Sequence, residues 1–269
     1  MVRDRLLASS LGASGVERPA LDRTSTGVPG LDPLIEGGLP ANRAFALCGG
    51  TGTGKTTFGL QFIAEGLRNG DNGAFVCTDE KPRHLVENAT SLGLDLEGAM
   101  AKGQLELLDA APFFSATRSG AWTRSASDAR EVASDLVQQI KGISARRLVI
   151  DSVTSLVPPD MEAGHVFSYL RSLVYSLEDN FGCTTILTCR RPKRDPLGIA
   201  EAIRALATGI IDLRLARRGE RRERLLCVEK MRGRELDLAE HRLSLTRGYG
   251  LCVVAPVERP VARDLFKAV

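Results

Sequence analysis

Cysteine pairs at metal-binding spacing, clustered histidines and long apolar runs are all missing from this chain of 269 residues. Its six cysteines form no C-x-x-C pair, and its three histidines, His84, His165 and His241, lie far apart, which argues against a zinc site. The first ten residues lack the apolar core of a signal peptide, and no stretch approaches the length of a membrane span. We therefore expect a soluble cytoplasmic protein with reduced cysteines and no membrane contact.

The net charge of the chain is also small. The 36 basic and 33 acidic residues leave a net charge of +3, which is too small for a strong electrostatic field and argues neither for nor against nucleic acid. Apolar residues make up 43% of the chain, which is enough for a hydrophobic core. The length allows one large domain or two small ones, and no internal repeat divides it.

One segment carries a specific signal, because residues 49–56 read G-x-x-x-x-G-K-T, the phosphate-binding loop of nucleoside triphosphatases. Glycines let the backbone approach an anion, successive N–H groups form a nest for phosphates, and the following helix adds the positive end of its dipole. Lys55 supplies a point charge for the outer phosphates, and the Thr56 hydroxyl is placed for Mg²⁺. The residues expected to hold ATP are Gly50, Thr51, Gly52, Thr53, Gly54, Lys55, Thr56 and Thr57.

The sequence on either side of this loop fits the same interpretation. Residues 44–48 form a short apolar run typical of a buried strand, and residues 57–67 repeat apolar side chains at helical spacing. A strand, the loop and a helix in this order are the setting that a phosphate-binding loop requires. The alternative is a glycine-rich turn that only precedes a helix.

Strands and helices alternate through the first 190 residues, which predicts an α/β fold with a parallel sheet covered by helices on both faces. The predicted strands of this part are residues 44–48, 74–77, 104–108, 147–151 and 183–188. Later strands follow one another without helices, and we expect hairpins that extend the sheet at residues 210–215, 225–231, 241–246 and 251–254. A single phosphate-binding loop implies one ATPase domain, which we place at residues 21–256, between tails at 1–20 and 257–269.

Asp151 is the best candidate in the chain for a second Mg²⁺ ligand beside Thr56. It ends the apolar run Leu-Val-Ile-Asp, and nucleoside triphosphatases hold the metal with an aspartate at the end of a neighbouring strand. Buried strands often end in aspartate without such a role, so the pattern gains its meaning from the phosphate-binding loop.

Asp79 and Glu80 follow the predicted strand 74–77 and are candidates to orient or deprotonate the water that attacks ATP. Ligands of open α/β sheets bind at the carboxyl ends of the strands, so these acids should share one edge with the loop and with Asp151. The alternative is a solvated acidic turn before Pro82.

Several segments together resemble the KaiC-type branch of the RecA-like ATPases over about residues 24–256. They are residues 25–32 with 37–40, the loop at 49–56, the acidic pair at 79–80 with Pro82, and residues 150–155, 219–222 and 230–233. The loop alone does not single out this branch, whereas the ordered set does. The resemblance implies a RecA-like core that binds ATP and Mg²⁺ and hydrolyses ATP.

The resemblance also implies a homo-oligomer, a hexameric ring with ATP between subunits. In such rings a basic pair reaches the phosphates of the neighbour, so Lys230 and Arg232 would act in trans on ATP held by Lys55 of the next subunit. A cation from a partner can stabilise charge on the transferred phosphoryl group. By the residues alone, the pair is better explained as charges on an ordinary hairpin.

The chain departs from the family pattern at three points. The family usually has two glutamates at the acidic pair, so the shorter Asp79 would hold the water less well, or Glu80 would take over as general base. KaiC has two such domains in tandem, and this chain has one. The autophosphorylated pair of KaiC would fall near Ala205 and Leu206, which carry no hydroxyl group.

Three functions remain to be weighed. The first is a signalling ATPase that acts through protein partners. The second is a DNA-dependent ATPase of recombination or repair, favoured by the basic run at 190–194 because such cations contact phosphates, although no aromatic residue for base stacking lies within it. The third is a serine/threonine autokinase, and the missing hydroxyl groups at 205 and 206 count against it.

Overall fold

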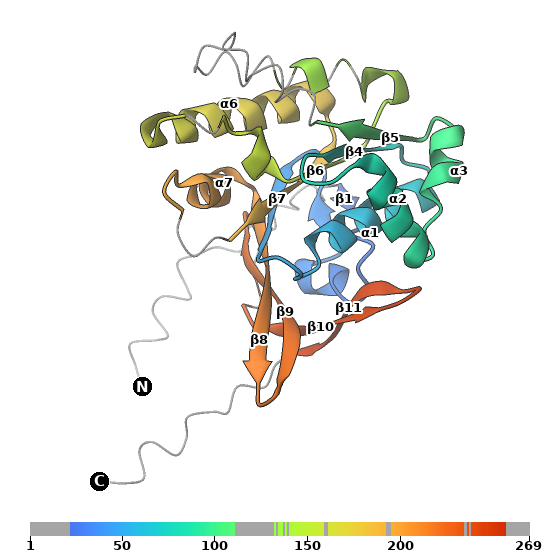
Figure 1. Ribbon diagram of the computed structural model, residues 1–269, viewed down its shortest axis with the longest axis vertical. Coiled ribbons are helices and arrows are strands. Elements are labelled where there is room, and N and C mark those ends of the chain that lie inside the picture. The colour runs from blue at the N-terminus through green and yellow to red at the C-terminus, as the bar shows by residue number, and fades with distance from the viewer. Residues whose placement is uncertain are drawn as a thin grey trace, which may run out of the picture.

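A computed structural model of the chain describes residues 22–110, 132–158 apart from 133, 137 and 139, 161–191, 195–233, 236 and 238–256. These residues form a nine-stranded sheet with helices, and a small second sheet of β1 (Arg23–Thr24) and β2 (Leu39–Pro40) (Figure 1). The predicted tails at 1–20 and 257–269 lie outside the described residues, as do residues 192–194 of the basic run.

The strand order of the large sheet is β11-β10-β9-β8-β3-β7-β6-β4-β5. The strands are β3 (Ala44–Gly49), β4 (Gly73–Cys77), β5 (Leu105–Asp109), β6 (Arg147–Asp151), β7 (Thr184–Arg190), β8 (Gly209–Arg218), β9 (Arg221–Met231), β10 (His241–Thr246) and β11 (Gly250–Pro256). Neighbours from β5 to β8 run parallel, and neighbours from β8 to β11 run antiparallel. The predicted α/β fold with closing hairpins is confirmed.

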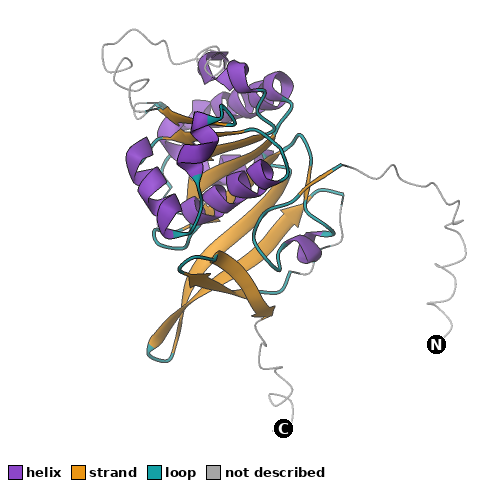
Figure 2. Cartoon of the chain, turned by 90° about the vertical axis from the view of Figure 1, so that its right-hand side faces the viewer, coloured by secondary structure: helices purple, strands orange, loops and turns teal. Residues whose placement is uncertain are grey.

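Helices cover the parallel part of the sheet on both faces. The core on one face includes α1 (Lys55–Arg68), α2 (Pro82–Ser91) and α3 (Leu96–Ala101), and the core on the other includes α6 (Ala163–Phe181) and α7 (Ile199–Leu206). Short 3-10 turns lie at Asp32–Ile35, Lys141–Ile143 and Val153–Leu156. The β8–β9 hairpin extends beyond these layers (Figure 2).

Strand β3 is buried along its whole length because it lies between β7 and β8. Phe45 and Leu47 point into the core beneath α1, whereas Ala44, Ala46 and Cys48 face α6 and α7. An uninterrupted apolar run is what a strand buried on both faces requires. The loop that follows β3 therefore starts from the middle of the sheet.

Helix α6 repeats apolar residues at helical spacing, and these positions, Val166, Leu170, Leu173, Val174 and Leu177, are all buried. The segment between α2 and β5 was not predicted to be helical and contains α3, which Asp95 caps by accepting a hydrogen bond from the Gly98 amide over 2.8 Å. Among the described residues, none of the helices is both long and apolar enough to cross a bilayer.

The contact between α1 and the sheet yields a stability prediction. A Cβ at Gly59 would lie 2.9 Å from Val149 Cγ1 and 3.1 Å from Phe75 Cε2, both in the core. We expect Gly59→Ala to lower the free energy of unfolding by about 1–2 kcal/mol, because overpacking outweighs the better helix propensity of alanine. Chemical denaturation measures this change.

Gly164, near the start of α6, is the matched control because a Cβ there would meet nothing within 4 Å. Gly164→Ala should leave the stability unchanged or raise it by up to about 1 kcal/mol. Equal stability of the two variants would contradict the close packing of α1 on β4 and β6.

Candidate functional site

The predicted phosphate-binding loop connects β3 to α1. Gly52 and Gly54 have φ angles of 77° and 112°, which side chains other than glycine rarely adopt. A Cβ at Gly54 would also lie 3.1 Å from Leu251 Cδ2 on β11. Gly54 is the N-cap of α1, so the positive end of the helix dipole lies at the loop.

Lys55 lies folded over this loop. Its Nζ donates hydrogen bonds to the carbonyl oxygens of Gly49 and Gly50, each over 3.0 Å. Burial lowers the pKa of the ammonium group, Asp151 opposes this shift, and Arg190 adds to it. The loop thus holds a partly desolvated cation through neutral carbonyl groups, and a phosphate oxygen is a stronger partner for it.

Asp151, at the end of β6, is held between two hydroxyl groups. Thr56 Oγ1 donates to Asp151 Oδ2 over 2.6 Å, and Thr188 Oγ1 on β7 donates to the other carboxylate oxygen. The two residues predicted to bind Mg²⁺ are therefore adjacent.

A hydroxyl and a carboxylate fit Mg²⁺, which prefers oxygen ligands and keeps several positions for water and phosphate. Among the described residues, no group of three or more His, Cys, Asp or Glu side chains is placed to enclose a metal ion. The donor set therefore fits an ion that arrives with a phosphate ligand better than an ion enclosed by protein.

The acid Asp79 is already engaged by protein groups. It accepts hydrogen bonds from Ser155 Oγ over 2.7 Å and from Ser152 Oγ over 3.4 Å. It also forms an ion pair with Arg190, at 2.9 Å between the Arg190 guanidinium and Asp79 Oδ2. Both oxygens of this carboxylate thus have partners.

The neighbouring acid Glu80 differs. Its Oε1 is buried without a hydrogen-bond partner among the described residues, while Oε2 accepts from Asn88 Nδ2 over 3.4 Å. Burial raises the pKa of Glu80, and the charge of Asp151 raises it further. A carboxylate with one unoccupied oxygen and a raised pKa has the properties of a general base.

These groups line one open cavity of about 420 Å³ at the carboxyl ends of the strands. The predicted residues that line it are Thr51, Gly52, Gly54, Lys55, Thr56, Thr57, Asp79, Glu80 and Asp151. Gly50 and Thr53, which we also predicted, do not line it. Thr53 Oγ1 donates instead to the Gly50 carbonyl over 2.9 Å, so this pair stabilises the loop internally.

Two arginines that reach the cavity were missed as site residues. Arg224 on β9 donates from Nε to the Gly52 carbonyl over 3.3 Å, and Arg190 enters through its ion pair with Asp79. The position of Arg190 just after the predicted strand 183–188, at the carboxyl end of a strand of the parallel sheet, was an available signal. Nothing in the sequence spacing indicates that β9 reaches the loop.

A second hollow of about 440 Å³ shares Thr56, Thr57 and Leu245 with the first. Its other lining residues are the apolar Leu60 and Leu92 and the polar Asn88, Ser91, Thr246 and Arg247. The two hollows are therefore contiguous, one rich in charged groups and the other with apolar walls. Such a pair suits a ligand with an anionic end and a flat, less polar end.

The predicted basic pair Lys230 and Arg232 does not line the cavity of its own chain. Lys230 Nζ donates to the carbonyl oxygens of Arg204 and Ala205 over 3.0 and 3.1 Å, and the Arg232 guanidinium donates to Ala205 over 3.1 Å. Both cations thus lie at the carbonyl end of α7, and burial lowers the pKa of Lys230.

The basic run at 190–194 is described only at Arg190 and Arg191. Arg190 pairs with Asp79, and Arg191 forms an ion pair of 2.7 Å with Asp212, whose side chain is fully buried. The two described cations of the run are thus committed to carboxylates within the chain.

Comparison with known proteins relates this chain to ATPases. The family model described as "ATPase: KaiC" matches residues 24–258. A UPF0273 protein of Methanopyrus kandleri is 32% identical over 231 residues, which are 84% of this chain and 90% of that protein. The circadian clock oscillator protein KaiC of Synechococcus elongatus is 32% identical over 86% of this chain, which corresponds to only 44% of KaiC.

A solved structure agrees with these relationships. The crystal structure of a KaiC-like protein from Pyrococcus horikoshii is similar with a TM-score of 0.71 at 32% identity, and it covers 87% of this chain and 99% of that one. The RecA-like core expected from the sequence therefore agrees with the fold, and the cavity lies at the end of its central strand.

Proposed function

This chain belongs to the KaiC family of ATPases, and we propose that it binds Mg-ATP in the cavity after β3 and hydrolyses it within a ring of identical subunits. The observation that carries the proposal is the convergence of Lys55, Thr56, Asp151 and Glu80 on one cavity. Phosphoryl transfer to water needs a cation beside the phosphates, metal ligands and a general base. Lys55 would be the cation, Thr56 and Asp151 the metal ligands, and Glu80 the base.

The phosphate-binding loop and its neighbours would hold the phosphate end of ATP. The loop amides and Lys55 bind the phosphates, and Lys55 exchanges its carbonyl partners for phosphate oxygens. Thr56 and Asp151 would hold Mg²⁺, and the ion would supply positive charge to neutralise the phosphates. Thr188 keeps the Asp151 carboxylate oriented through its hydrogen bond.

Glu80 is the proposed general base, in preference to Asp79. Its Oε1 has no hydrogen-bond partner in the part of the chain that the structure describes and is available to accept a proton from water, whereas Asp79 is bound by Ser155 and Arg190. A raised pKa makes Glu80 a stronger base when it is ionised. Asp79 instead positions Arg190 beside the phosphates, where a cation stabilises developing charge.

We propose that the second hollow binds the nucleobase of ATP. Leu60, Leu92 and Leu245 provide apolar surface for a flat ring, and Asn88 and Ser91 provide hydrogen-bonding groups at its edge. Thr56 and Thr57 line both hollows, so the proposed sites for the two ends of the nucleotide adjoin each other.

Lys230 and Arg232 are the proposed trans-acting cations. They do not line the cavity of their own chain. Their hydrogen-bond partners are neutral carbonyl groups at the end of α7, and a phosphate of a neighbouring subunit is a stronger partner for a cation. This role requires a head-to-tail contact in which each subunit completes the site of the next, and such contacts close into rings.

We propose that the ring is cytoplasmic and signals through protein partners. A DNA-dependent ATPase is the second candidate, but Arg191 is paired with the buried Asp212 and Arg190 is assigned to the ATP phosphates, so two cations of the run on which it depends have other roles. A serine/threonine autokinase is the third, and Ala205 and Leu206 offer no hydroxyl group to phosphorylate.

The first test is the binding of nucleotide by Lys55→Ala. We expect its affinity for Mg-ATP to fall roughly 100-fold, because removal of one partner of a desolvated charge pair costs about 3 kcal/mol. Titration calorimetry measures the affinity. The exposed Lys102→Ala is the control, and affinity unchanged from wild type in Lys55→Ala would refute the nucleotide site.

The two acids separate in a second test. Glu80→Gln should lower kcat by roughly 100-fold or more while sparing ATP binding, whereas Asp79→Asn should lower kcat by less than about tenfold. The exposed Glu87→Gln serves as the control. The opposite ranking of the two variants would make Asp79 the base.

The pH dependence checks the same assignment. The base must be ionised, and burial raises the pKa of Glu80, so kcat should fall on acidification at a pH above the ordinary glutamate value of about 4.3. This acidic limb should be absent from the residual activity of Glu80→Gln.

Mixed rings test action in trans. Rings of Arg232→Ala alone and of Lys55→Ala alone should both be inactive. In an equal mixture, about a quarter of the head-to-tail contacts join an intact loop to an intact arginine, so activity should recover to about that fraction. If mass measurements show mixed rings and the activity stays at the level of the single variants, the arginine does not act between subunits.

A further inference from the structure

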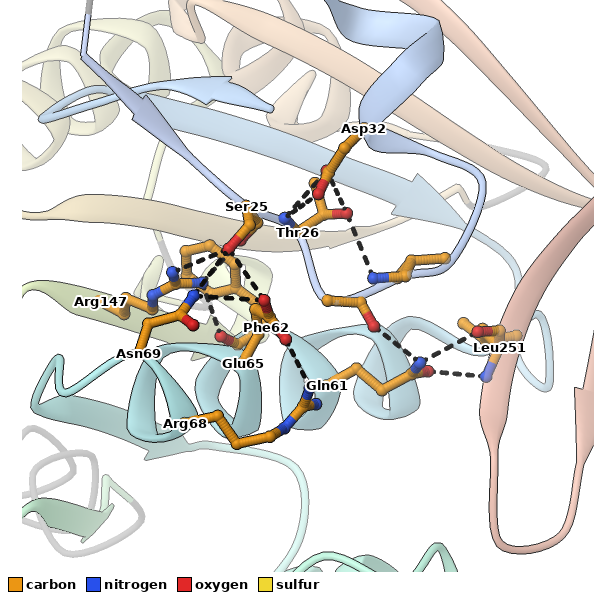
Figure 3. Close-up of polar contacts among 12 residues, drawn as sticks. Ser25, Thr26, Asp32, Gln61, Phe62, Glu65, Arg68, Asn69, Arg147 and Leu251 are labelled. Carbon is orange, nitrogen blue, oxygen red and sulfur yellow. Dashed lines mark hydrogen bonds and ion pairs between the residues drawn. The ribbon is translucent and has the colours of Figure 1, made fainter. Parts of the chain in front are cut away.

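Gln61 is a buried polar residue on the face of α1 that otherwise enters the core. It is 4% exposed, and all three of its side-chain hydrogen bonds go to backbone groups. The side-chain nitrogen donates to the carbonyl oxygens of Gly27 over 3.1 Å and of Leu251 over 3.0 Å, and the side-chain oxygen accepts from the Leu251 amide over 2.7 Å (Figure 3). A buried amide is tolerated only with such partners.

These contacts fasten the edge of the sheet to α1. Strand β11 is at the edge of the sheet, and β10 is its one neighbouring strand among the described residues. On its other side the Val253 amide donates to the Pro29 carbonyl over 2.9 Å, and Leu251 meets Gln61. Gln61 binds both the N–H and the C=O of Leu251 at that edge, as a neighbouring strand would. The approach is so close that a Cβ at Gly250 would lie 2.6 Å from Gln61 Cδ.

The fastened strand lies against the phosphate-binding loop. The Leu251 side chain is fully buried and lies so close to Gly54 that a Cβ there would be 3.1 Å from Leu251 Cδ2. Gly54 is the N-cap of α1, one residue before Lys55. Gln61 therefore holds β11 at the point where the loop becomes helix.

The strand paired with β11 lines the second hollow. Leu251 is opposite Leu245 in the register of β10 and β11, and Leu245 lines both hollows of the cavity. Thr246 and Arg247, the next residues of the hairpin, line only the second hollow. Thr57 and Leu60 on α1 also line the second hollow, so the position of the hairpin relative to α1 affects the shape of this hollow.

We propose that Gln61 is a positioning residue that fixes the β10–β11 hairpin against α1 and so supports binding of the nucleoside end of the ligand, not of its phosphates. This inference rests on the proposed function, because it assumes that the second hollow binds the nucleobase of ATP. Gln61 touches no ligand; it acts through Leu251 and Leu245. The phosphate groups bind to the loop and to Lys55, and the hydrogen bonds of Lys55 go to the Gly49 and Gly50 carbonyl groups, not to the hairpin.

Two ligands test the inference on the full-length protein, Mg-ATP and Mg-tripolyphosphate, which has the phosphates without the nucleoside. Gln61→Met keeps the size of the side chain and removes its hydrogen bonds. We expect its affinity for Mg-ATP to fall about tenfold and its affinity for tripolyphosphate to stay within about twofold of wild type. Calorimetry measures both affinities. If Gln61→Met does not fold, Gln61→Glu replaces it, because it keeps the acceptor for the Leu251 amide. It should likewise lose affinity for Mg-ATP and keep its affinity for tripolyphosphate.

Thr26→Val is the matched control. Thr26 is also fully buried and polar, and its hydroxyl donates to Asp32 Oδ1 over 2.6 Å in the same region, but it does not contact the hairpin (Figure 3). Its affinities for both ligands should stay near those of wild type. An equal loss of both ligands in Gln61→Met, or the same loss of ATP in Thr26→Val, would overturn the inference.

A double-mutant cycle tests the route through Leu245. Leu245 is 38% exposed, so Leu245→Ala should fold and should weaken ATP but not tripolyphosphate. If Gln61 acts through the hairpin, the double variant should bind ATP several-fold more tightly than the product of the single losses predicts. Additive losses would refute the route. If wild-type protein binds neither ligand, the proposed function fails; if wild type binds both and the Gln61 variants do too, only the positioning role fails.

Discussion

The hydrogen bond from Thr56 to Asp151 is the contact on which the geometry of the site depends. It joins the first turn of α1 to the end of β6, two positions 95 residues apart, and Thr188 on β7 holds the other carboxylate oxygen. The central position of β3 makes this possible, since β7 is its neighbour and β6 the next strand. A shared edge of parallel strands thus places the hydroxyl and carboxylate that we propose as metal ligands beside the loop that we propose for the phosphates.

Two adjacent acids acquire different properties from their surroundings at this edge. Asp79 turns toward Ser155 and Arg190, where hydrogen bonds and an ion pair occupy its oxygens. Glu80 lies partly buried near Asp151, and both burial and that negative charge raise its pKa. The assignment of a base in this site is therefore a question of environment, because residue type alone makes the two acids equivalent.

The antiparallel end of the sheet adds residues to the site that are distant from the loop in sequence. Strand β9 sends Arg224 to the Gly52 carbonyl, and β10 contributes Leu245 to the wall of the cavity. Gln61 fastens this part of the sheet to α1 through Leu251. The parallel part of the fold thus holds the groups proposed to bind phosphate and metal, and the closing hairpins contribute lining residues beside them.

The sequence by itself determined the parts of the site that are local. A loop of fixed spacing between an apolar strand and a helix identifies Lys55 and Thr56, and an apolar run ending in aspartate identifies Asp151, because these signals need only neighbouring residues. Only the tertiary structure decided that Asp79 is paired while Glu80 keeps one oxygen without a partner among the described residues, that Arg224 reaches the loop, and that Gln61 binds Leu251. Those contacts join residues far apart in the chain, and strand order and register, which no local pattern encodes, bring them together.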